Sequence, residues 1–308
     1  MTIILFLSLI VFVHELGHFL AARFFGVQVN IFSIGFGPKL FSIKDKKKTV
    51  WQVCAVPLGG YVQMPMNQLF GLKKSVISLA GPFMNFIFSF MLFFAVIFAN
   101  GFPTIKPIVR DVMPGSMAQK YDIRTQDEIV SINGKSVEEI QNVLKQSKQV
   151  ELKIKRGQDE LIKQIEMTQD KLGVIFETTV QKIGFIASAK KSFMSVALIC
   201  SKMFWSLFSW ASFKDVGSVI SVFSISKTQY EHGIYAFLSF IAFLSVNLGF
   251  INLLPIPVLD GGYVCIGFYE MVTRKRLNKN LHDRIMVIGF LLLLLLMTVS
   301  IFNDIFRR

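Results

Sequence analysis

The sequence predicts a polytopic α-helical membrane protein with four transmembrane helices, a β-hairpin after the first of them and one inserted α+β domain. Hydrophobic residues make up 53% of the 308 positions, 32 residues are phenylalanine, and the mean hydropathy is +0.54. This composition excludes a disordered chain and an ordinary soluble domain. Apolar runs long enough to cross a bilayer are separated by basic loops and by one long stretch of charged, mixed sequence.

The net charge of +13 does not indicate a nucleic-acid partner. Lysine and arginine collect in loops beside apolar segments, where the positive-inside rule and attraction to anionic lipid account for them. Cys54, Cys200 and Cys265 are far apart and show no Cys-x-x-Cys spacing. They indicate free thiols rather than a disulfide framework or a thiolate zinc site. We therefore expect the lipid bilayer, and no nucleic acid, as a partner.

The first apolar run, residues 2–25, contains His14-Glu15-Leu16-Gly17-His18. Residues four apart share one face of a helix, so both imidazoles can reach one metal ion, with Glu15 beside them as a base. A chance pattern on a core helix is the alternative. However, two histidines and a glutamate in hydrocarbon cost roughly several kcal/mol unless they have partners. The run therefore indicates a membrane-embedded zinc-hydrolase helix, with His14 and His18 as Zn²⁺ ligands and Glu15 as the catalytic base.

The sequence that flanks this run predicts its orientation. No lysine or arginine precedes it and Arg23 follows it, which is the reverse of a signal peptide, so we expect it to be retained with the N-terminus outside. Residues 39–43 and 49–54 then flank the turn-like segment 45–48 and predict a β-hairpin, although an ordinary surface hairpin fits the pattern equally well. The basic residues of this region place it in the cytoplasm.

A second apolar span, residues 75–100, carries the chain outward and contains Ala80-Gly81-Pro82 and Asn85, groups that permit close helix approach. The sequence after it becomes charged and mixed. Four stretches there have the character of strands, and a fifth has helical spacing. These are residues 108–113, 128–132, 150–156 and 160–167 for the strands and 137–145 for the helix, with a turn at Asn133-Gly134. They predict a small α+β domain on the outer side.

Residues 192–213 predict a helix that lies at the membrane interface, because polar side chains follow one stripe of an otherwise apolar segment. A parity argument supports this interpretation. If the segment does not cross, the third span, about residues 235–254, ends on the cytoplasmic side. The end of the first span near His14 and His18 lies on the same side. The fourth span, residues 285–301, then returns outward and leaves both termini outside.

The sequence directly after the third span contains a candidate for the third metal ligand. Asp260 follows it directly, after a segment in which two prolines break the helix, and such broken backbone is tolerated in a membrane where it lines a polar cavity. His232 and His282 are less well placed, on the outer side and in a basic loop. The alternative for Asp260 is a turn residue before Gly261-Gly262.

The predicted organisation has four parts. Residues 1–100 hold the first two spans and the hairpin, residues 103–168 the inserted domain, residues 169–233 a linker and the amphipathic interfacial helix, and residues 234–308 the last two spans.

The motifs together resemble those of the site-2 protease family of intramembrane zinc metalloproteases. They are His14-Glu15-x-x-His18, Ala80-Gly81-Pro82-x-x-Asn85, and residues 247–262, Asn-Leu-Gly-Phe-Ile-Asn-Leu-Leu-Pro-Ile-Pro-Val-Leu-Asp-Gly-Gly. The single insert and the ending Phe302-Asn303-Asp304 resemble the bacterial RseP type. The resemblance covers nearly the whole chain.

This resemblance implies a set of roles. His14, His18 and Asp260 would bind zinc, and Glu15 would polarise the attacking water. The positions implied to bind substrate are Asn247 and Asn252, which would hold an unwound segment, and Gly59, Gly60 and Tyr61 of a membrane-associated β-hairpin. The insert would be a PDZ-like domain, residues 109–167.

The resemblance also implies a location and a substrate class. The protein would lie in the bacterial inner membrane, with the insert and both termini in the periplasm and the active site toward the cytoplasm. Its substrates in regulated intramembrane proteolysis would be transmembrane segments already trimmed on the outer side, such as anti-sigma factors, and remnant signal peptides. Two departures from the family pattern are Lys120-Tyr121-Asp122-Ile123, where relatives often have Ala-Gly-Leu, and Tyr263, where they commonly have histidine.

Two functions of other classes are also consistent with these motifs. A catalytically silent PDZ membrane scaffold would not need a costly buried base such as Glu15. A metal transporter could use intramembrane histidine and aspartate, but the single site without an evident inverted repeat disfavours it.

Overall fold

The computed structural model describes residues 2–135, 149–166, 172–208, 225–226 and 228–306, which divide into two compact units. The helical unit is formed by Met1–Ala99 and Gly184–Arg308, and the inserted unit by Asn100–Ile183. The helical unit contains α1 (Thr2–Phe24), β1 (Ile31–Lys44), β2 (Val50–Gln63), η1 (Met66–Gln68), α2 (Leu72–Asn100), α5 (Phe185–Ser206), α7 (Ile234–Asn252), α8 (Asp260–Thr273) and α9 (Lys279–Phe306). The inserted unit contains β3 (Phe102–Val112), α3 (Met117–Lys120), β4 (Glu128–Ile132), β5 (Gln149–Arg156), β6 (Asp159–Glu166) and β7 (Val174–Gln181).

Four of the described helices, α1, α2, α7 and α9, are long and apolar enough to cross a membrane. This confirms the four predicted spans. The helices α2 and α9 begin at Leu72 and Lys279, earlier than residues 75 and 285, because basic and polar residues continue each helix beyond its apolar part. The helix α8 was not predicted; its sequence is short and only moderately apolar.

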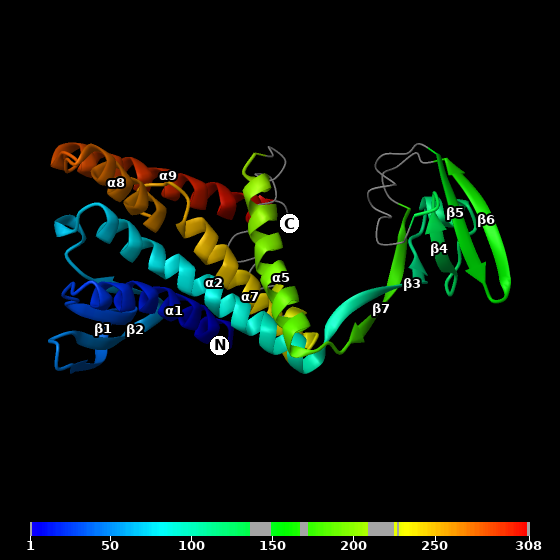
Figure 1. Ribbon diagram of the computed structural model, residues 1–308, viewed down its shortest axis with the longest axis horizontal. Helices are drawn as coiled ribbons and strands as arrows, with labels where there is room; N and C mark the ends of the chain where they lie inside the picture. Colours follow the sequence, from blue (N-terminus) through cyan, green and yellow to red (C-terminus); the bar gives the residue numbers. More distant parts are fainter. Residues whose placement is uncertain (1, 136–148, 167–171, 209–224, 227, 307–308) are drawn as a thin grey trace. The chain divides into compact units, whose positions relative to one another are not determined.

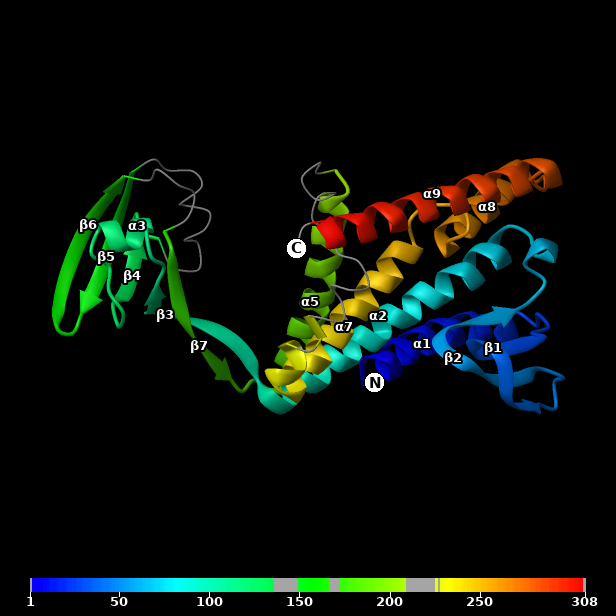
Figure 2. The ribbon, with the colours of Figure 1, turned by 180° about the vertical axis from the view of Figure 1, so that it is seen from behind.

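The helices α1, α2 and α7 pack together and form the core of the helical unit (Figures 1 and 2). The fully buried Ile10 and Ile241 join α1 to α7. The helices α2 and α7 approach closely, since a Cβ atom at Gly249 would be only 3.0 Å from the Pro82 carbonyl oxygen. Ser89 Oγ donates to the Ala242 carbonyl oxygen at 2.9 Å across the same contact. Small and hydroxyl residues are the usual means of close packing between membrane helices.

The predicted interfacial segment coincides in part with α5, which is not among the four candidate spans. The helix begins at Phe185, where the aromatic ring packs against Phe94 and Phe98 of α2. Residues 209–213 of the predicted segment lie outside the described part of the chain.

The strands β1 and β2 form a small sheet beside α1, and this sheet contains more strand segments than a simple hairpin. Both strands are 14 residues long and bend, so each contributes two segments to the sheet. Residues 31–34 pair with 50–53 on one side and with 60–63 on the other, and residues 39–44 pair with 50–54. The predicted strands 39–43 and 49–54 lie in this sheet.

Gly59-Gly60-Tyr61, which the family resemblance assigns to a β-hairpin, lies inside β2, and Gly60 and Tyr61 pair with Ile34 and Ser33. Gly59 has φ +103°, a conformation that favours glycine, and the bend there lets the chain fold back along β1. Residues 60–63 therefore form one open edge of the sheet, whereas residues 50–53 lie inside it.

The inserted unit is an antiparallel five-stranded sheet with the order β6-β5-β4-β3-β7. Its core is formed by the inward-facing side chains of β4, β5 and β6, which pack around the fully buried Ile129 and Leu152. The predicted domain ends at residue 168, but β7 pairs with β3 along most of its length, so the unit continues to Ile183. The predicted helix 137–145 lies outside the described residues.

A buried ion pair ties the turn before β4 to β5. Asp127 accepts two hydrogen bonds from the Arg156 guanidinium, at 2.7 and 2.8 Å, and one from the Arg124 backbone N–H. Burial raises the pKa of Asp127, but these hydrogen bonds outweigh it and hold the pKa below its usual value. The pair therefore stabilises this unit at neutral pH, and that contribution is lost only as the pH falls through the lowered pKa of Asp127.

Candidate active site

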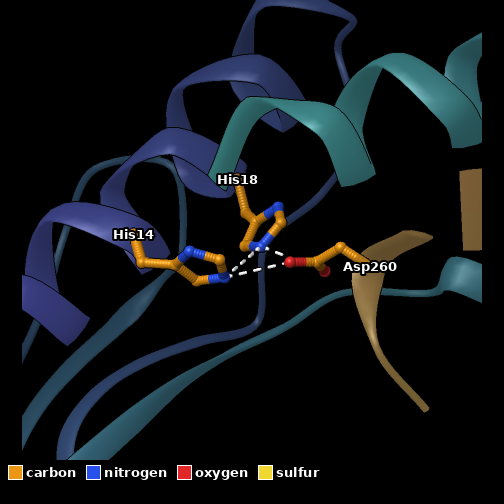
Figure 3. A group of neighbouring side chains, drawn as sticks. All are labelled: His14, His18 and Asp260. Atoms are coloured by element: carbon orange, nitrogen blue, oxygen red, sulfur yellow. Dashed lines mark hydrogen bonds and ion pairs between the residues drawn. The ribbon is translucent and has the colours of Figure 1, made fainter. Parts of the chain in front are cut away.

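His14, His18 and Asp260 meet in the helical unit, although 242 residues separate His18 from Asp260 (Figure 3). The first two project from one face of α1, and Asp260 is the first residue of α8. The Nε2 atoms of His14 and His18 are 3.2 Å apart, and they lie 3.0 and 3.3 Å from the two carboxylate oxygens of Asp260. The predicted third ligand is thus brought to the two predicted histidines.

These spacings suit a tetrahedral metal ion. Ligand atoms bound to zinc at about 2.0–2.2 Å in a tetrahedral arrangement are roughly 3.3 Å from one another. The two histidine nitrogens are separated by close to this distance, and each lies at a similar distance from a different oxygen of Asp260. Two nitrogens with one carboxylate are a donor set that zinc prefers. The residues present therefore fit a zinc ion and leave a fourth position open.

The second ring nitrogens of the histidines have partners that direct Nε2 toward the ion. His18 Nδ1 lies 2.8 Å from the Ile77 carbonyl oxygen, which can only accept, so Nδ1 carries the proton and Nε2 keeps its lone pair. The Asn85 Nδ2 atom lies 3.2 Å from His14 Nδ1, whereas the buried Oδ1 atom of the same carboxamide has no hydrogen-bond partner. With the carboxamide turned so that Oδ1 faces the ring, Oδ1 accepts a hydrogen bond from the His14 Nδ1–H and completes the same arrangement.

Glycine allows α1 and α2 to approach closely enough for these contacts. A Cβ atom at Gly17 would overlap the Ala80 carbonyl, and one at Gly81 would overlap His18 Nε2. Ala80-Gly81-Pro82 thus allows the close helix packing that was predicted for it. The contact places the α2 backbone directly against the His18 ring.

The position of Asp260 depends on contacts that hold α8 against the start of α2. Glu270 accepts a hydrogen bond of 2.7 Å from Lys74 Nζ and one of 3.1 Å from the Gly71 N–H, and both side chains are buried. Ser75 Oγ donates to the Val264 carbonyl oxygen one helical turn after Asp260. Local sequence patterns could not pair Lys74 with Glu270, because no motif spans the 196 residues between them.

A cavity of about 500 Å³ opens beside the three ligands. Besides the metal ligands its walls include polar groups from α1, β2, α2, α7 and α8, namely Glu15, Tyr61, Ser78, Asn252 and Tyr263. Its apolar walls are Val11, Val62, Met64, Met66, Leu248, Val258 and Leu259. A polar cavity among apolar helices gives water and a peptide a place to react inside the protein.

The predicted substrate-binding residues fall into two groups. Asn252 lines the cavity, and its amide nitrogen is 3.4 Å from His14 Nε2. Tyr61 also lines the cavity. Gly60 lies next to the cavity residue Glu15, since a Cβ atom at Gly60 would be 3.7 Å from Glu15 Cγ. Asn247 is not among the cavity residues, and its amide donates to the Phe243 carbonyl one turn earlier in α7. Gly59 provides the bend before the open edge.

The comparisons with known proteins agree with this arrangement. The model of "Peptidase family M50" matches residues 2–296. A protein of Rickettsia conorii is 31% identical over 98% of this chain and 97% of its own length; one of Campylobacter jejuni is 32% identical over 99% and 92%. One of Clostridium perfringens is 32% identical over 97% and 96%. Each bears the name "Putative zinc metalloprotease".

The chain belongs to peptidase family M50, the site-2 proteases. It is a membrane protease of this family, and zinc is its metal. The family match covers the first three candidate spans completely and the fourth as far as residue 296.

Loss of the Asn85 side chain should weaken zinc binding. The variant Asn85→Ala removes the partner of His14 Nδ1, and losing such a partner typically lowers metal affinity by roughly 10- to 100-fold. The measurement is zinc retention during titration with a competing chelator. Ser89→Ala, one turn further along α2, is the matched control for a lost buried polar group. An Asn85→Ala titration that overlays the wild type would contradict this role.

Proposed function

We propose that this protein is an intramembrane zinc endopeptidase of the RseP type, which cleaves transmembrane segments of membrane proteins in regulated intramembrane proteolysis. The observation that carries the proposal is the cluster of His14, His18 and Asp260 with Glu15 beside it, in a cavity among helices apolar enough to span a bilayer. The substrates would be segments already trimmed on the outer side, such as those of anti-sigma factors, and remnant signal peptides.

The residues of the cavity have complementary roles in this reaction. Bound zinc would activate a water molecule and polarise the scissile carbonyl. Glu15 takes a proton from the attacking water and delivers it to the leaving amine. Glu15 of α1 and Val62 of β2 line the same wall of the cavity.

A helical substrate must unwind before attack, because its carbonyls are engaged in internal hydrogen bonds. Strand addition to residues 50–54 would recover those bonds, but residues 50–53 already have neighbours on both sides. The open edge at residues 60–63 is the better docking strand. The Gln63 carbonyl accepts from the Asn30 N–H, so by strand alternation the backbone groups of Gly60 and Val62 face outward, toward Glu15.

Asn252 would hold the unwound substrate backbone at the opposite wall of the cavity, where its amide lies beside His14. Gly59 and Gly60 keep the docking edge free of side chains, and the Tyr61 ring lines the cavity. Asn247 would act only with a substrate that extends along α7 beyond the cavity, because its amide bonds to Phe243 in the free protein.

The inserted unit would be a PDZ-like domain that acts as a size filter and excludes proteins with bulky outer domains. Its two ends are adjacent, since Phe102 pairs with Gln181, so the unit could be inserted between α2 and α5 without changing either helix. A peptide-binding role is the alternative for this unit.

We place the protein in the bacterial inner membrane, with the metal site toward the cytoplasm and both termini in the periplasm. Basic residues near the His18 end of α1 support this orientation under the positive-inside rule. They are Arg23, which binds Asp45, and the lysines of the adjoining turn, Lys46, Lys47 and Lys48.

The decisive test of the proposed function is cleavage of a short transmembrane model substrate by the purified protein in detergent. Glu15→Gln should reduce kcat by at least about 100-fold, because the proton acceptor is lost while the zinc ligands remain. Chelation should abolish cleavage, and returned zinc should restore it. Equal turnover by wild type and a zinc-loaded Glu15→Gln variant would favour the silent scaffold or the metal transporter.

Strand addition predicts a pattern in the substrate itself. Backbone N-methylation at successive substrate positions near the scissile bond should depress cleavage at alternate positions, because only every second N–H of an added strand faces the protein edge. Each neighbouring position is the matched control. Uniform effects along the segment, or a periodicity near 3.6, would contradict docking of an extended strand.

A size filter predicts a change in selectivity when the inserted unit is removed. Replacing residues 102–181 with a short Gly/Ser turn should allow cleavage of substrates that keep a folded outer domain, while cleavage of trimmed substrates and zinc content stay unchanged. Unaltered discrimination between the two substrates would contradict filtering. Loss of cleavage of the trimmed substrate alone would favour peptide binding.

A further inference from the structure

We propose that the Ser78 hydroxyl is an additional catalytic hydrogen-bond donor, which binds the oxygen of the scissile carbonyl as that oxygen gains negative charge. The inference rests on the proposed peptidase function and assigns a role to a residue of α2 that no motif singled out. Its support comes from the burial of Ser78, its place in the cavity and its nearness to His18.

The Ser78 hydroxyl is buried without a partner. The side chain is 1% exposed, and its Oγ atom makes no hydrogen bond within the described chain. The other two serines of α2 differ: Ser75 Oγ donates to the Val264 carbonyl, and Ser89 Oγ donates to those of Asn85 and Ala242. Buried hydroxyls are nearly always paired, so an unpaired one beside a reactive site indicates a partner that arrives with the substrate.

Ser78 faces the reacting centre. It lines the same cavity as Glu15 and Asp260, and it lies on the face of α2 that also carries Gly81. A Cβ atom at Gly81 would overlap His18 Nε2, and residues three apart on a helix have Cβ atoms about 5–6 Å apart. Ser78 therefore lies one helical turn from the point where α2 contacts the Nε2 atom of His18.

A donor at this place matches the charge that the reaction creates. When water adds to the scissile carbonyl, the electron pair of the C=O bond moves to its oxygen, while the water proton goes to Glu15. The Ser78 hydroxyl keeps its own proton and donates a hydrogen bond to that oxygen. A donor that is already desolvated and held by a helix needs no rearrangement at the moment of reaction, and such donors are worth roughly 100- to 1,000-fold in kcat.

The test compares Ser78→Ala with Ser78→Thr, which restores a hydroxyl, and with Ser89→Ala as the matched loss of a buried serine on the same helix. Cleavage of the transmembrane model substrate gives kcat and KM separately. Affinity for a phosphinate peptide, whose tetrahedral anionic centre imitates the charged oxygen, is measured beside affinity for the matched amide peptide in the Glu15→Gln background. Zinc content is determined for every variant.

Ser78→Ala should lower kcat by about 100-fold and weaken phosphinate binding by a similar factor. KM, amide-peptide binding and zinc content should stay unchanged. Ser78→Thr should recover most of the activity, and Ser89→Ala should leave kcat near the wild-type value.

Other results would overturn the proposal. These are a kcat for Ser78→Ala within about threefold of the wild type, a loss confined to KM, or a loss that follows zinc content. A decrease in kcat for Tyr263→Phe without one for Ser78→Ala would assign the donor to Tyr263 instead.

The phosphinate comparison separates this inference from the proposed function. If wild type cleaves no transmembrane substrate, the proposed function fails, yet weaker phosphinate binding by Ser78→Ala would still support the donor. If wild type cleaves and Glu15→Gln does not, the function holds, and unchanged phosphinate binding by Ser78→Ala would overturn the donor alone.

Discussion

The contacts between Asp260 and the two histidines join α1 to α8, and the arrangement of the other helices serves this junction. A carboxylate and two imidazoles among apolar helices are unfavourable unless each ligand atom and each second ring nitrogen has a partner. Ile77 and Asn85, both on α2, supply the ring-nitrogen partners, so α2 must lie directly against α1. Gly17 and Gly81 make this close packing possible, because a Cβ atom at either position would overlap the facing helix.

The same junction needs irregular backbone inside the helical unit. Between α7 and α8 the chain leaves helical geometry at residues 253–259, where Val258 adopts φ +82° and the two prolines cannot donate hydrogen bonds. Freed backbone groups are tolerated in a membrane protein where they line a polar cavity, and this segment contributes Val258 and Leu259 to the cavity wall. The buried Lys74–Glu270 pair anchors the C-terminal part of α8. Asp260 is therefore held by residues 253–259 on one side and by the anchored helix α8 on the other.

Local patterns in the sequence were sufficient to predict the four candidate spans and to select the three residues that the fold brings together. Apolar runs located four candidate helices, and the His-Glu-x-x-His spacing with the broken third span led to Asp260. Local patterns could not reveal that residues 60–63 return to pair with 31–34, because that pairing depends on a bend at Gly59 rather than on alternation. They also could not reveal Ser78 or Glu270, whose importance comes from neighbours brought together by folding: an open cavity in one case and Lys74 in the other.

The open edge and the metal site depend on each other. An unpaired strand edge is normally a liability in a protein, because it invites pairing with any extended chain. Here the edge at Gly60 and Val62 lies against Glu15, so a chain that paired with it would be carried into the cavity where Glu15, His14, His18 and Asp260 converge. A helical segment has no free backbone groups to offer this edge. Selection for substrates that unwind readily would therefore follow from backbone hydrogen bonding alone, before any side chain is recognised.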